Sequence, residues 1–69
     1  MAETASDLMR KAMENNGIGW GELLAKSKEL AIEETDRNFE RFSAGGAVSI
    51  TIAAAIVTLI VQKKGRSRG

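Results

Sequence analysis

The chain has 69 residues and contains no cysteine, histidine or proline. The lack of cysteine excludes disulfides and thiolate metal sites, and the lack of histidine removes the commonest general base. The net charge of +1 hides an asymmetry: residues 1–41 carry six bases against nine acids, a net −3, whereas residues 62–69 carry four bases and no acid, a net +4. We therefore expect no enzyme, no cofactor and no metal, and two ends that face different environments.

Residues 1–16 predict a short amphipathic helix. Thr4 and Asp7 have the spacing of a capping box at its start, and Asn15-Asn16-Gly17 is typical of a helix end. An apolar stripe at helical spacing is formed by Leu8, Met9, Ala12 and Met13.

Residues 17–21 contain three glycines around Ile18 and Trp20. Such a stretch predicts a flexible, Gly-rich joint between two helices. The alternative is a contact with a membrane interface in which Trp20 acts as the anchor, since tryptophan prefers that depth.

Residues 22–41 predict a second, charged amphipathic helix that continues without a break into the apolar segment after it. Its polar face is acidic, whereas helices that lie on membrane surfaces tend to be basic there. We therefore expect its apolar stripe to pack against other helices. The stripe consists of Trp20, Leu23, Leu24, Ser27, Leu30, Ala31 and Phe42.

Residues 42–62 carry no charge. As one helix these 21 residues would rise about 32 Å, which matches a bilayer core of about 30 Å. The segment therefore predicts a transmembrane helix in a single-pass membrane protein. The density of bases after it favours a cytoplasmic C-terminus.

Small side chains in this segment recur every four residues and predict close helix packing, either between copies of the chain or with other membrane helices. One row consists of Gly45, Ser49 and Ala53, and the other of Ala47, Thr51 and Ala55.

Residues 63–69 form a basic, glycine-containing tail with Lys63, Lys64, Arg66 and Arg68. Three partners are open for these bases: the headgroups of membrane lipid, a nucleic acid phosphate backbone bound without regard to sequence, or an acidic protein.

The order of an acidic arm (Glu22 to Glu40), an apolar segment (Ala44 to Val61) and a basic end resembles the major coat proteins of filamentous bacteriophages, the inoviruses. This resemblance implies a virion coat protein that waits in the inner membrane and then packs around single-stranded DNA. The small-residue rows would pack helix on helix, and the four C-terminal bases would face the DNA.

The sequence thus predicts an all-α chain: a short helix, a joint, and a long amphipathic helix that continues into a transmembrane helix. The expected function is non-enzymatic self-assembly as a homo-oligomer, with a coat-like role as one form of it. The alternatives are a small accessory subunit of a larger membrane complex and a holin-like or toxin-like permeabilising peptide.

Overall fold

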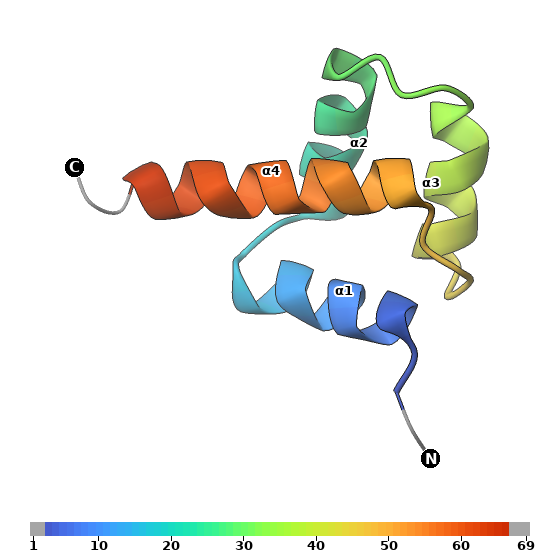
Figure 1. The fold of residues 1–69 in the computed structure, drawn as a ribbon, viewed down its shortest axis with the longest axis horizontal. Coiled ribbons are helices and arrows are strands. Elements are labelled where there is room, and N and C mark those ends of the chain that lie inside the picture. Colours follow the sequence, from blue (N-terminus) through green and yellow to red (C-terminus); the bar gives the residue numbers. More distant parts are fainter. Residues whose placement is uncertain (1–2, 67–69) are drawn as a thin grey trace.

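A computed structural model describes residues 3–66. Within this range the chain forms four α-helices and no strands, which confirms the predicted all-α class. They are α1 (Ala5–Asn15), α2 (Trp20–Glu29), α3 (Thr35–Ser43) and α4 (Ile50–Arg66). Helix α4 packs against the other three, and α2 also packs against α3 (Figure 1). In this view α1 lies below α4, and α3 stands at the end of the molecule where α4 begins.

One face of α4 supplies half of the core. Its buried side chains recur at the three- and four-residue spacing of a helix face, and they are Ile52, Ala55, Ile56 and Leu59. The rest of the core comes from the N-terminal half and α3, through Met13, Ile18, Leu23 and Phe42. The fold is therefore three short helices gathered on one side of a longer one.

The end of α1 follows the sequence prediction. Gly17 adopts a left-handed conformation with φ +67°, and its N–H donates to the Glu14 carbonyl at 3.2 Å. The Ile18 N–H donates to the Met13 carbonyl at 2.9 Å, which completes a Schellman motif. The turn delivers Ile18 into the core beside Met13.

The predicted continuous helix over residues 22–41 is broken between α2 and α3. The break has the same Schellman geometry, but Ala31 takes the left-handed position with φ +56° in place of a glycine. The Ile32 N–H donates to the Ser27 carbonyl at 3.2 Å, and the half-buried Ile32 side chain packs against the core. Core packing by Ile32 thus favours the break, although neither glycine nor proline marks it in the sequence.

A second break divides the uncharged segment. Gly45 has φ +95°, and the Gly46 N–H donates to the Arg41 carbonyl at 2.8 Å, so α3 also ends in a Schellman motif. A Cβ built on Gly46 would lie 2.8 Å from the Arg41 carbonyl oxygen, closer than real contacts allow. The new helix starts after Ser49, whose Oγ accepts from the Ile52 N–H at 3.1 Å as an N-cap does.

The expectations of a transmembrane helix, a single-pass topology and a membrane localisation with a cytoplasmic C-terminus are wrong for this structure. None of the helices formed by residues 3–66 combines the length and apolarity that crossing a membrane requires. The physical reason is the second break, because only Ile50 to Gln62 remain as uncharged helix. At a rise of about 1.5 Å per residue these span about 20 Å, against a hydrocarbon core of about 30 Å.

Replacing Ala31 with glycine should stabilise the protein. A residue with a Cβ pays roughly 1–2 kcal/mol to adopt the left-handed conformation, and glycine would remove this cost. Part of the resulting stabilisation is offset by the larger backbone freedom of glycine in the unfolded chain. We expect Ala31→Gly to raise the unfolding free energy by about 1 kcal/mol and Tm by about 4–8 °C, measured by circular dichroism. The matched control Ala25→Gly, at an exposed position inside α2, should lower stability by about 1 kcal/mol. Equal losses in both variants would contradict the prediction.

Candidate functional site

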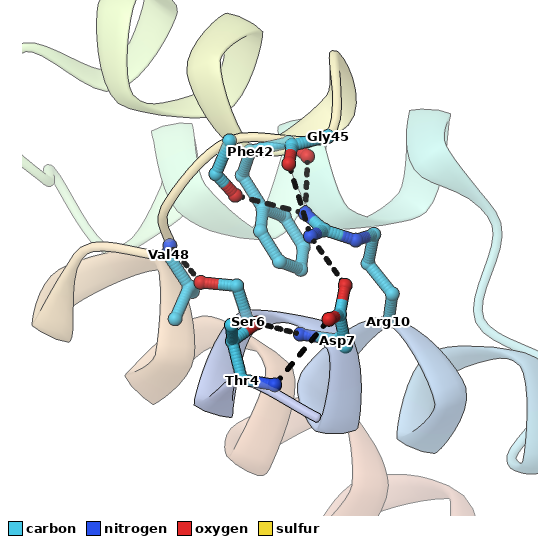
Figure 2. A network of polar contacts seen from close by, with 8 residues as sticks. Thr4, Ser6, Asp7, Arg10, Phe42, Gly45 and Val48 are labelled. Atoms are coloured by element: carbon cyan, nitrogen blue, oxygen red, sulfur yellow. Dashed lines mark hydrogen bonds and ion pairs between the residues drawn. The ribbon is translucent and has the colours of Figure 1, made fainter. Parts of the chain in front are cut away.

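Arg10 of α1 forms the main polar contact between distant parts of the chain (Figure 2). Its Nη1 donates to the carbonyls of Phe42 at 2.8 Å and Gly46 at 2.9 Å, and its Nη2 donates to the Gly45 carbonyl at 3.2 Å. The guanidinium carbon also lies 4.9 Å from the centroid of the Phe42 ring, within cation–π range. Arg10 thereby binds carbonyls at and just beyond the end of α3, where a cation is also favoured by the helix dipole.

The first turn of α1 orients this arginine. Asp7 accepts from Arg10 Nη2 at 3.0 Å. The same carboxylate accepts from the Thr4 N–H at 3.3 Å, while the Asp7 N–H donates to Thr4 Oγ1 at 3.1 Å, so the predicted capping box forms. One residue away, the buried Ser6 hydroxyl accepts from the Val48 N–H at 2.7 Å. The start of α1 therefore holds both ends of the segment that connects α3 to α4.

The pKa of Asp7 is lowered from its ordinary value of 3.8. The hydrogen bond from Arg10 is the largest cause, followed by those from the Thr4 hydroxyl and the Thr4 N–H. Each of these contacts favours the ionised carboxylate over the neutral acid. The network therefore stabilises the ionised form of Asp7.

A hollow of about 300 Å³ lies over this network and is lined by Thr4, Ser6, Asp7, Arg10, Gly45, Gly46 and Ala47. The polar groups in its wall bond to one another, and among residues 3–66 every buried side-chain nitrogen or oxygen has a hydrogen-bond partner. Because both terminal nitrogens of Arg10 donate to backbone carbonyls or to Asp7, the arrangement holds the fold together.

Trp20 stands at the first turn of α2 and packs edge-on against two aromatic rings. Its ring centroid lies 6.1 Å from that of Phe39 and 5.5 Å from that of Phe42. The side chain remains 40% exposed beside a second hollow of about 290 Å³, which Arg10, Met13, Glu14 and Ile18 also line. The predicted interface anchor therefore contacts the aromatic side chains of α3, and a membrane contact stays a prediction.

The outward face of α4 is the main apolar surface of the molecule. Ile50 is 88% exposed, Val57 53% and Val61 63%, and Ala54 between them is also exposed. Their spacing of four, three and four residues is that of the a and d positions of a coiled coil, so they form one narrow stripe. We call these four residues the α4 stripe. The α4 stripe is therefore the candidate interaction surface of the described residues.

The structure does not arrange the two predicted small-residue rows on one helix. Gly45 and Ala47 lie in the segment before α4, and Ser49 caps that helix. In α4 itself Thr51 is exposed, Ala53 half-buried and Ala55 fully buried. Within α4, the alanine, valine, leucine and isoleucine side chains that are exposed are those of the α4 stripe.

The predicted basic end is described in part. Lys63 Nζ lies 3.2 Å from Glu22 Oε2 and ties the end of α4 to the start of α2, and the neighbouring Lys64 is exposed. The side chain of Arg66 and all of Arg68 lie outside the described residues. Contacts of these bases with lipid headgroups, nucleic acid or an acidic protein stay predictions.

Comparisons with protein-family models, with curated proteins and with solved structures found no match for this chain. Its function must therefore be argued from its own residues.

Two features were not foreseen from the sequence. The Arg10 contacts join residues up to 36 positions apart, and no local pattern announces them. The α4 stripe, in contrast, is visible as a heptad spacing in residues 50–61, once a helix start at Ile50 is known.

Arg10→Met should destabilise the protein by at least about 2 kcal/mol, because a single hydrogen bond to a charged donor contributes about 1.5–3 kcal/mol and three carbonyls lose theirs. Urea unfolding followed by circular dichroism measures this change. Lys11→Met is the matched control, because Lys11 makes an exposed ion pair with Glu3 at 2.8 Å. Its cost should stay below about 0.5 kcal/mol. Similar losses in the two variants would show that the Arg10 contacts do not stabilise the fold.

The lowered pKa of Asp7 predicts acid-sensitive stability. A carboxylate whose folded pKa lies below its unfolded value contributes stability above the unfolded value of 3.8, and this contribution is lost as the pH falls through the folded pKa. In Asp7→Asn the unfolding free energy should therefore fall less on acidification from about pH 6 to pH 3 than in the wild type. Parallel pH profiles for the two proteins would refute this role of Asp7.

Proposed function

We propose that this chain is a non-enzymatic helical building block that self-associates through the α4 stripe. The observation that carries the proposal is an exposed apolar stripe on a helix whose opposite face is already in the core. Self-assembly is the part of the sequence-based prediction that we keep, whereas the membrane-spanning part is not proposed again.

The composition of α4 supports an interaction role. Between Ile50 and Gln62 the helix has no charged residue, and its only polar residues are Thr51, Thr58 and Gln62, so its apolar positions extend beyond the face that enters the core. The three shorter helices cover only the face that contains Ile52, Ile56 and Leu59. The opposite face, which holds the α4 stripe, is not covered by these helices and is available to another molecule.

The exposed apolar area is concentrated on this face. Ile50, Val57 and Val61 make up half of the large apolar side chains that are exposed in the described part of the chain. Covering a fully exposed aliphatic side chain contributes about 1.5–3 kcal/mol, so a stripe of this kind supplies a useful driving force for association.

The polar features support the same function. The Arg10 network is internally satisfied and positions the start of α4, so its role is to present the α4 stripe in a fixed orientation. Lys63 is engaged with Glu22 and fixes the other end of the helix against α2. A stripe fixed at both ends loses little conformational freedom when it is covered.

Val57→Glu should weaken self-association, measured by sedimentation equilibrium over a dilution series. Placing a charge in the middle of a covered apolar stripe costs more than the roughly 1.4 kcal/mol that corresponds to a tenfold change in Kd. We therefore expect at least a tenfold increase in Kd. Leu8→Glu on α1 is the matched control, since Leu8 is 56% exposed and Val57 53%, and it should leave Kd unchanged.

Circular dichroism should show that both variants keep the helical content of the wild type, since neither replaced side chain is buried. A wild type that stays monomeric at about 1 mM would contradict the proposal, because any association stronger than about −4 kcal/mol is visible there.

A further inference from the structure

The spacing of the α4 stripe is symmetric about its midpoint, since its residues follow one another at four, three and four positions. Reversing the helix direction places Ile50 opposite Val61, and Ala54 opposite Val57. Large side chains then meet at both ends, and in the middle a small side chain meets a larger one. Such alternation fills space, whereas a parallel pair in register sets Ala54 against Ala54 and leaves a gap there.

The charges at the two ends of the molecule are also opposite in sign. Val61 is followed by Lys63 and Lys64 at the far end of α4. At the other end stands α3 (Figure 1), and residues 29–43, which include it, carry five acids against two bases, a net −3. Helix α3 itself is neutral, so this excess comes from Glu29, Glu33 and Glu34, between the end of α2 and the start of α3. The molecule is 36 Å long, several times the screening length of about 8 Å at physiological salt, so the two ends act as separate charged surfaces.

We infer that the occupant of the α4 stripe is a second copy of this chain, packed antiparallel about a two-fold axis that passes between positions 54 and 57. This inference rests on the proposed function and adds the number of copies and their orientation. In this arrangement the basic end of each copy lies toward the acidic end of its partner, twice by symmetry. A parallel pair would instead bring the two basic ends together, and because Glu22 offsets only one of the charges of Lys63 and Lys64, these ends would still repel each other.

The antiparallel direction also suits the helix dipoles. Each α4 helix has a partial positive charge at Ile50 and a partial negative charge at its C-terminal end. Antiparallel packing puts opposite partial charges beside each other at both ends. Packing volumes, side-chain charges and dipoles therefore favour the same orientation.

Cysteine cross-linking tests the orientation directly, because the chain has no cysteine of its own. The variants Ile50→Cys and Val61→Cys of the 69-residue chain are made separately, at side chains that are 88% and 63% exposed. One variant carries an isotope label, and each is oxidised alone or in a mixture in a glutathione buffer. Intact-mass spectrometry then separates labelled, unlabelled and mixed disulfide dimers.

An antiparallel pair predicts mixed dimers as the main product, at least tenfold above the dimers that either variant forms alone. Two Ile50→Cys sites in such a pair lie about 16 Å apart along the axis, far beyond the Cα separation of about 4.4–6.8 Å that a disulfide allows. Ala54→Cys with Val57→Cys should give the same preference for the mixed product, although less sharply, because both sites lie near the axis.

The two proposals fail in distinguishable ways. A wild type that is dimeric by sedimentation, with Ile50→Cys cross-linking to itself, would overturn the antiparallel pairing and leave self-association standing. A monomeric wild type with no cross-links in any mixture would overturn both. A larger assembly whose cross-links show no pairing preference would also overturn the two-fold arrangement.

Discussion

The Arg10 guanidinium holds the segment between α3 and α4, and the remaining architecture depends on that contact. Its hydrogen bonds to the carbonyls of Phe42, Gly45 and Gly46 fix where α3 stops. Ser6 fixes Val48 at the other end of the same segment. With this segment held by α1, α4 starts at Ile50, just after the Ser49 cap. The choice of which α4 face enters the core, and which face stays exposed, follows from this starting point.

As a consequence, the uncharged segment 42–62 is divided between the end of α3, a turn and α4. As one helix, residues 42–62 would be about 32 Å long, whereas the three short helices have 9 to 11 residues and reach about half that length. The turn at Gly45 and Gly46 returns the chain on itself, so that Phe42 and Ile52 enter one core from the two sides of the turn. A small domain gains most from such folding back, because its surface is large relative to its volume. What is left over is the α4 stripe, on which the proposed self-association relies.

Features that depend on interactions between residues close in sequence could be predicted from the sequence. The Thr4–Asp7 capping box and the end of α1 at Gly17 depend on residues within one turn of each other, and the all-α class follows from helical periodicity. The break at Ala31 could not be predicted, since alanine has no preference for the left-handed conformation and Ile32 packing decides the turn. The transmembrane prediction failed because it counted uncharged residues and treated Gly45-Gly46 as ordinary members of a membrane helix. The Arg10 contacts join distant positions and leave no trace in either sequence neighbourhood.

The aromatic cluster of Trp20, Phe39 and Phe42 has a practical consequence. Trp20 is the sole tryptophan and the chain contains no tyrosine, so its ultraviolet emission comes almost entirely from one ring. That ring touches two side chains of α3, and one of them, Phe42, lies under the Arg10 guanidinium. Its fluorescence spectrum is therefore an intrinsic, label-free reporter of whether α1, α2 and α3 have come together.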